Sequence, residues 1–150
     1  APSRPDKSPE SDPVRDWEAA TPVDGLRRLF ARIMFGPALD YARDVLDELA
    51  RRPADVVASS EMLYGAMIAA GASRVPRAIV ATTVSIVPIP GIPPLGQGLL
   101  PPRGDAERQV QAQIARGLTA MLDEGLPAVN AARCALGLAP PLPESQGVAS

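Results

Sequence analysis

The chain has 150 residues, 46% of them hydrophobic but only 3% aromatic, and a formal net charge of −2. These values predict one domain with an aliphatic core, and the lack of a basic stripe (Lys7 is the only lysine) argues against a nucleic-acid partner. The chain has no histidine, which removes Ser-His-Asp and Cys-His nucleophile schemes and disfavours a zinc site.

The first residues carry no targeting signal. Residues 1–20 are rich in proline, serine and acidic residues, so we expect them to be disordered or a linker. They lack the apolar core of a signal peptide. Further along, six prolines and three glycines from Pro88 to Pro102 exclude a membrane-spanning helix in the only long uncharged stretch. We therefore expect a cytoplasmic protein with no membrane span.

Two helices are predicted next. The segment Thr21–Asp24 has the sequence of a helix start, with a threonine cap and a proline at the first helical position. This helix is expected to reach Phe35, before Gly36-Pro37. A second helix is predicted over residues 38–52, because its apolar residues recur at helical spacing.

The following segment predicts a βαβ unit. Residues 55–59 and residues 77–82 are short apolar runs of strand type. Between them, residues 61–72 predict a helix capped by Ser60 that is apolar nearly all round, so it must be buried on most sides. Strand, helix and strand in this order predict two parallel strands with a right-handed crossover, and hence an α/β fold.

A long uncharged stretch follows the second strand. Between Arg77 and Arg103 lie twenty-five residues without a single charge. After the strand this stretch becomes a loop too apolar to remain uncovered in water. Two covers remain open: an apolar ligand, in a pocket that the prolines of residues 86–100 hold open, or a packed neighbouring domain.

The last third of the chain predicts two more helices, over residues 104–124 and 127–137. The first carries a buried stripe, and the second ends at a C-cap glycine, Gly137. We interpret Cys134, the only cysteine, as a small apolar side chain buried in the second of them. Residues 139–150 are expected to be a flexible tail, which leaves residues 21–138 as the folded unit.

The two predicted strands are too few to form a stable parallel sheet of their own. Two parallel strands do not normally form a stand-alone sheet, because parallel sheets have more strands and are covered on both faces. Here both outer edges would be exposed, and the apolar helix would lack enough sheet to cover it. We therefore expect either that the chain is part of a larger α/β domain or that a partner chain supplies the missing sheet.

Five pieces of the sequence, taken in order, carry a family resemblance. They are Asp55–Val57, Gly65-Ala66, Ala69-Ala70, Val75–Ala78 and the stretch Val129–Pro140. Together they resemble the middle of the acceptor domain in macrolide- and UDP-glucuronosyl-type glycosyltransferases of the GT-B fold. The last piece is similar to the Asn-x-x-Arg-x-x-Leu-Gly-Leu-x-Pro stretch of that family. The resemblance covers roughly residues 23–143.

The resemblance implies a partial Rossmann-like domain, the acceptor-binding half of a nucleotide-sugar-dependent transferase. Such an enzyme is inverting and metal-independent, and it moves a hexosyl group to an apolar small molecule, such as a natural product. The family's catalytic histidine and its C-terminal nucleotide-sugar domain have no counterpart here. We therefore expect no cofactor in this chain and no activity from it alone. Two alternatives stay open: a non-catalytic helper that binds a small molecule or an enzyme, and a small α/β or mostly helical domain whose resemblance is accidental.

Candidate site residues lie where each predicted strand ends and in the apolar loop. Glu61 is the acid nearest to the place where the family has an aspartate that orients the histidine, or it is a first-turn acid favoured by the helix dipole. The serine and threonine hydroxyls either face a ligand or satisfy helix and loop backbone, and Met62 has core packing as its alternative. The predicted substrate-binding residues are Ser59, Ser60, Met62, Thr82, Thr83, Ile86, Pro88 and Ile89. No metal ligand is predicted.

Overall fold

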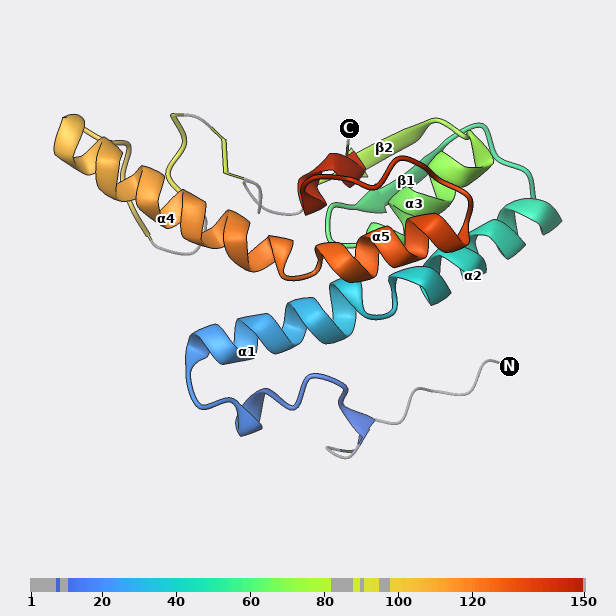
Figure 1. The fold of residues 1–150 in the computed structure, drawn as a ribbon, viewed down its shortest axis with the longest axis horizontal. Coiled ribbons are helices and arrows are strands. Elements are labelled where there is room, and N and C mark those ends of the chain that lie inside the picture. The colour runs from blue at the N-terminus through green and yellow to red at the C-terminus, as the bar shows by residue number, and fades with distance from the viewer. Residues whose placement is uncertain (1–7, 9–10, 82–87, 90, 95–97, 150) are drawn as a thin grey trace.

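The computed structural model describes residue 8 and residues 11–81, 88–89, 91–94 and 98–149 (Figure 1). In chain order the elements are η2 (Asp16–Glu18), α1 (Pro22–Leu29), η3 (Phe30–Phe35), α2 (Ala38–Arg51), β1 (Val57–Ser60), α3 (Tyr64–Ser73), β2 (Arg77–Val80), α4 (Asp105–Asp123), α5 (Leu126–Ala135) and η4 (Ser145–Ala149). Among these residues β1 and β2 form a two-stranded parallel sheet, with Val57 opposite Arg77 and Ser60 opposite Val80. The predicted α/β class and the βαβ unit are confirmed.

The first helix begins as its sequence predicts. The Thr21 hydroxyl accepts a hydrogen bond from the Asp24 backbone N–H at 3.1 Å, and Pro22 occupies the first helical position. The helical course reaches Phe35 as expected, but its last six residues, η3, wind as a π-helix. This looser turn brings Phe30, Met34 and Phe35 into the core.

Helix α3 is the centre of the core. Every residue from Tyr64 to Ala70 is buried, which confirms the prediction of a helix enclosed on most sides. Its cover is not mainly sheet: α2 packs along it most extensively, and α5, η3 and η4 also contact it. The expectation that this helix would lack cover was therefore wrong, because helices that follow and precede the βαβ unit supply the missing apolar surface.

Gly65 allows α2 and α3 to approach each other closely. A Cβ built on Gly65 would lie 2.5 Å from the Ala38 carbonyl oxygen and 2.6 Å from the Tyr41 Cβ. Any side chain at this position would therefore push the two helices apart. The small residues of α3 serve this tight contact, in which Ala38 and Ala42 of α2 are also fully buried.

The boundaries of the elements on either side of Ser60 differ from those predicted. Strand β1 begins at Val57 and ends at Ser60, two residues later and one residue later than expected. Ser60 therefore belongs to the strand and does not cap α3, which begins at Tyr64 after Leu63. The Ser60 hydroxyl instead accepts a hydrogen bond from the Met62 N–H at 3.3 Å, in the turn between the two elements.

Helix α5 ends as expected at Gly137, whose φ of 74° is left-handed. The Gly137 N–H donates to the Cys134 carbonyl at 3.0 Å and the Leu138 N–H donates to the Arg133 carbonyl at 2.9 Å, the paired bonds of a Schellman end. Cys134 itself is exposed, so its predicted burial was wrong. The buried face of α5 is instead formed by Val129 and Ala132.

The residues after α5 return to the body of the molecule. We call residues 139–149 the C-terminal strap. The Asn130 side chain donates to the Leu142 carbonyl at 3.0 Å and accepts from the Leu142 N–H at 2.8 Å. Asp123 accepts from both the backbone N–H and the hydroxyl of Ser145, each at 2.9 Å. Val148 is then buried in the core. Two side chains of α4 and α5 thus fix the course of the strap.

One face of the sheet is open. Arg77 and Ile79 lie around a hollow with Ala70 and Gly71, which places these two strand residues on the face toward α3. Because side chains alternate along a strand, Ala58, Ala78 and Val80 lie on the opposite face. All three are exposed, Val80 to 55%. We call these three residues the open face of the sheet.

Candidate functional site

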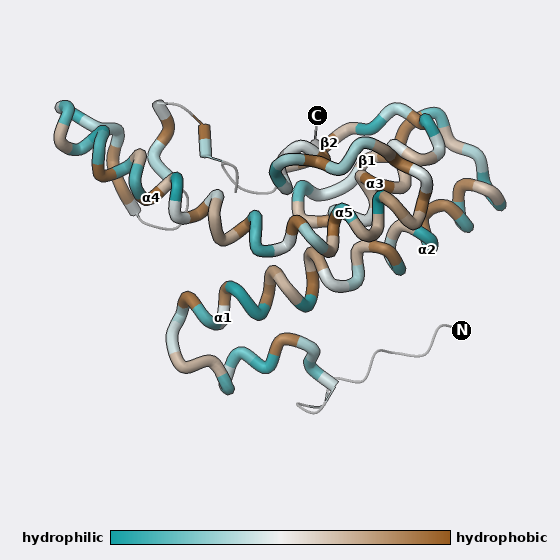
Figure 2. The backbone as a smooth tube through the Cα atoms, viewed as in Figure 1, coloured by the Kyte–Doolittle hydropathy of each residue, from teal (hydrophilic) through white to brown (hydrophobic). Residues whose placement is uncertain are grey.

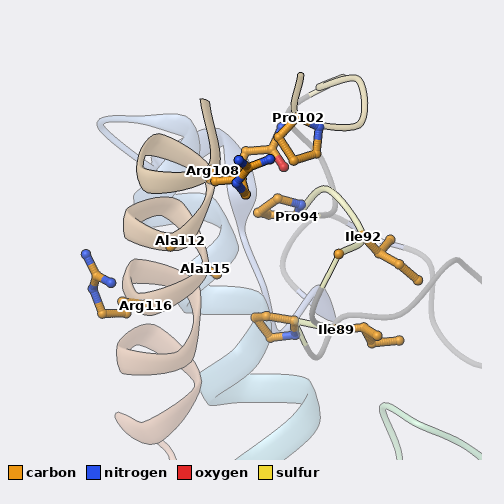
Figure 3. A pocket seen from close by; sticks show the side chains of 11 residues that line it. Ile89, Ile92, Pro94, Pro102, Arg108, Ala112, Ala115 and Arg116 are labelled. Carbon is orange, nitrogen blue, oxygen red and sulfur yellow. The ribbon is translucent and has the colours of Figure 1, made fainter. Parts of the chain in front are cut away.

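A cavity of about 420 Å³ lies between α4 and the chain that follows β2 (Figure 3). We call it the slot. Its loop wall consists of Pro88, Ile89, Gly91, Ile92, Pro94 and Pro102. Its helix wall consists of Arg108, Gln111, Ala112, Ala115 and Arg116. The volume falls in the range of small-molecule sites, roughly 300 to 1,000 Å³.

The two walls differ in shape. Ala112 and Ala115 are one helical turn apart on α4, so their short side chains form a low, even surface. Opposite them, Pro94 lies toward the helix, whereas the side chains of Ile89 and Ile92 on the same loop point away from α4 (Figure 3). Prolines fix the backbone of this wall, so less conformational entropy is lost when a ligand orders it. The slot is therefore mainly apolar, with a wall that is partly preorganised.

The polar groups of the slot lie on the helix side. Figure 3 shows Arg108 reaching toward Pro102 and Pro94, at one end of the slot, whereas the Arg116 guanidinium points away from the loop. Gln111 donates to the Leu100 carbonyl at 2.8 Å, so its amide nitrogen holds the far part of the loop to α4. No aspartate or glutamate is among the residues that line the slot.

Arg108 is only partly neutralised. Its Nε and Nη2 donate to the same Asp105 carboxylate oxygen, at 3.2 and 2.5 Å. Within the described residues, Nη1 has no hydrogen-bond partner, and Nη1 belongs to the group that reaches over the slot. Asp105 is highly exposed, so solvent screens this pair and leaves Arg108 a positive group at the rim.

Helix α4 is polar on one side and apolar on the other, and its outer turns stand clear of the body (Figures 1 and 2). Leu122, near its C-terminal end, is the one residue of the helix that is buried, whereas Val110 in the second turn is 56% exposed. The predicted buried stripe on this helix is thus enclosed only toward the end that meets α5. The exposed half is the part that carries the slot.

The structure brings two of the predicted binding residues together. Pro88 and Ile89 both line the slot. Thr82, Thr83 and Ile86 lie outside the described residues. The placement of these three side chains stays a prediction.

The other predicted residues lie at the end of β1 and do not line the slot. Ser59 and Ser60 are the last two strand residues, and both are half-buried. Met62 packs against the hydrophobic core, which agrees with its alternative interpretation as a core residue. Glu61 is half-buried in the turn that leads to α3, close enough to Tyr64 to act on it electrostatically.

A buried polar group was not predicted from the sequence. Tyr64 is buried at the start of α3 and hydrogen-bonds to Ser145, which in turn donates its hydroxyl proton to Asp123. Burial raises the pKa of Tyr64 above its ordinary value of 10.0, and the charges of Asp123 and Glu61 act in the same direction. Because the phenol is enclosed and neutral, this group stabilises the fold and fixes the C-terminal strap.

The residues of the helix wall were also missed. Their only signal in the sequence is the presence of small and polar residues at 111, 112 and 115, beside the apolar stripe of α4. Alanines on a helix are ordinary helix formers, so their presence does not by itself indicate a binding wall. These residues line the slot only because the apolar loop lies opposite them on α4.

The described residues contain neither a metal-binding cluster nor a membrane-spanning helix. No group of three or more cysteine, aspartate or glutamate residues in the described part of the chain is placed to hold a metal ion. No helix there is long and apolar enough to cross a lipid bilayer.

Comparison with known proteins gives one distant relative. No protein-family model and no solved structure matches the chain. The chain is 28% identical over 111 residues to 4'-demethylrebeccamycin synthase from Lentzea aerocolonigenes, a glycosyltransferase. The match covers 74% of this chain and 26% of that protein, so it spans about a quarter of the relative's length. These findings support a distant relationship between this chain and a glycosyltransferase, as the resemblance in the sequence implies.

Proposed function

We propose that this chain is the acceptor-binding portion of a nucleotide-sugar-dependent glycosyltransferase that moves a hexosyl group to an apolar small molecule. The observation that carries the proposal is the similarity to a glycosyltransferase along three quarters of the chain. It agrees with the βαβ unit, since open α/β sheets bind ligands beyond the carboxyl ends of their strands. The loop wall of the slot comes from residues that follow β2 in the sequence.

The slot is the site that we assign to the acceptor. Its walls are mainly alanine, isoleucine and proline side chains, which suit an apolar molecule. One arginine at the rim and no carboxylate in the walls leave few polar groups to orient the ligand. An acceptor held there would present its hydroxyl group toward the polypeptide that binds the sugar donor.

The chemistry of transfer requires more than this chain. A base removes the proton from the acceptor hydroxyl, the oxygen attacks the anomeric carbon, and the nucleoside diphosphate leaves with the bonding electrons. The chain has no histidine to act as that base. We assign to it the positioning of the acceptor, which lowers the entropy cost of the attack. The base and the donor site would come from other polypeptide.

The open face of the sheet indicates where such polypeptide would pack. Ala58, Ala78 and Val80 are small apolar residues on a parallel sheet, and parallel sheets are normally covered on both faces. The relative is about four times as long as the matched region, so a protein of its kind has ample chain to cover this face.

A chimeric enzyme tests the proposal. Residues 21–149 of this chain, with the C-terminal strap, would replace the matched region of the Lentzea enzyme, and product formation would be followed by mass spectrometry over a panel of apolar acceptors. We expect transfer from the same sugar donor with a changed choice of acceptors. The purified chain alone should give no transfer.

The matched control fills the slot. Ala112→Phe places a large side chain on the exposed alanine wall, and Ala120→Phe makes the same change at an exposed position of α4 that does not line the slot. We expect the first to abolish acceptor use by the chimera and the second to preserve it. A folded chimera whose acceptors are unaffected by Ala112→Phe, or turnover by the chain alone, would contradict the proposal.

A further inference from the structure

The rim of the slot is positively charged at one end. Arg108 reaches over the end formed by Pro102 and Pro94, and no carboxylate lines the walls. Asp105 pairs with Arg108 itself, through Nε and Nη2, and Glu107 accepts from the Arg103 N–H at 2.7 Å. Arg108 therefore has its Nη1 edge left to offer to an anion in the slot.

From this arrangement we infer that the slot selects apolar ligands that carry an anionic oxygen group, such as a carboxylate, phenolate or sulfonate, at one end. The inference rests on the proposed function and specifies the acceptor class of the same site. The apolar body would lie between the alanine and proline walls, and the anionic oxygen would accept from Arg108 Nη1. At the opposite end, near Ile89, Arg116 also lines the slot, but its guanidinium points away from the loop (Figure 3).

The positive rim also distinguishes between possible occupants. A packed polypeptide segment with only neutral apolar side chains in the slot would leave Arg108 without a new partner. A ligand with a terminal anion satisfies both the apolar walls and the guanidinium. We therefore assign the slot to a small anionic amphiphile, and a polypeptide occupant becomes one outcome of the test.

Two fluorescent probes with the same rings test the inference. N-phenyl-1-naphthylamine is neutral, and 1-anilinonaphthalene-8-sulfonate adds a single anionic group to it. Titration of the full chain should show both probes binding, with the sulfonate bound more tightly by about threefold, the scale of an exposed ion pair. Ala112→Phe should abolish the binding of both, whereas Ala120→Phe should leave it unchanged.

Arg108→Gln and Arg116→Gln form the decisive pair. Both remove one positive charge from α4, but only Arg108 reaches over the slot (Figure 3). We expect Arg108→Gln to bring the ratio of the two affinities to about one and Arg116→Gln to preserve the ratio. Circular dichroism would verify that each variant is folded.

The outcomes separate the two proposals. If Ala112→Phe removes both probes but the affinity ratio is the same in the two arginine variants, the anionic preference is wrong while the acceptor slot stands. If neither probe binds, or if both still bind to Ala112→Phe, the slot is not a small-molecule site, and the proposed function fails together with the inference.

Discussion

The two sides of α3 differ sharply in how far the chain completes them. On one side α2, α5 and η3 enclose the helix, and Ile68 is 1% exposed. On the other side two short strands leave an open apolar face, with Val80 exposed to 55%. The chain therefore builds a helical core from its own residues but leaves its sheet and its slot open. This contrast indicates that stability resides mainly on the helical side of α3.

The largest effect is expected where α2 and α3 meet. Gly65→Ala would place a methyl group 2.5 Å from the Ala38 carbonyl oxygen, and overpacking of this kind costs about 3 kcal/mol. The matched control is Gly117→Ala in α4, where nothing lies within 4 Å and the substitution should stabilise by about 1 kcal/mol. Urea unfolding of both variants measures the difference. A neutral Gly65→Ala would show that the helical core is loosely packed.

The C-terminal strap should contribute next. Asp123→Ala leaves the N–H and hydroxyl of Ser145 without their partner in a buried site, which costs about 2 kcal/mol of unfolding free energy. Glu124→Ala removes an exposed ion pair with Arg27 and should cost less than about 0.5 kcal/mol. Equal effects of the two substitutions, measured by thermal unfolding, would show that the strap does not belong to the core.

The raised pKa of Tyr64 predicts that the protein loses stability at high pH. Its pKa is raised in the folded state, so the stabilisation is complete below the ordinary value of 10.0 and is lost as the pH rises through the folded-state pKa. The urea midpoint of the wild type should therefore fall between about pH 9 and about pH 11 more steeply than that of Tyr64→Phe. If the urea midpoint fell equally steeply with pH in both proteins, the burial of the Tyr64 phenol would be contradicted.

The smallest effect is expected on the open face. Val80→Thr should change the unfolding free energy by less than about 0.5 kcal/mol, because the side chain is already in contact with water. The same substitution at Val129, which is fully buried, adds an unpaired hydroxyl to the core and should cost about 2 kcal/mol. If both changes cost the same, the open face is covered by the chain itself.

The helical core was predictable from the sequence to a large extent. Periodic apolar residues and strong end signals, such as Thr21-Pro22 and Gly137, mark the helices, and these signals act locally. The continuous apolar character of residues 64–70 correctly indicated a buried helix. The boundaries at Ser60 were wrong because a serine serves equally well as a strand end and as a helix cap.

What covers α3 was not predictable, because it depends on contacts between distant parts of the chain. The prediction counted only the sheet as possible cover, whereas α2 and α5 enclose the helix. In the same way, no local pattern links Tyr64 to Asp123 or Asn130 to Leu142. Of the slot, the sequence indicated the apolar loop wall with Pro88 and Ile89, but not the alanine wall that the return of the chain places opposite.

Amide hydrogen exchange measured residue by residue tests most directly the contrast between the enclosed helix α3 and the uncovered sheet. We predict that the amides of Met67–Ala70 in α3 exchange only through global unfolding, whereas those of β2 exchange at least about a hundredfold faster, through local opening of an uncovered sheet. Protection of β2 equal to that of α3 would contradict the account, since it would mean that the chain already closes its sheet and needs no further polypeptide there.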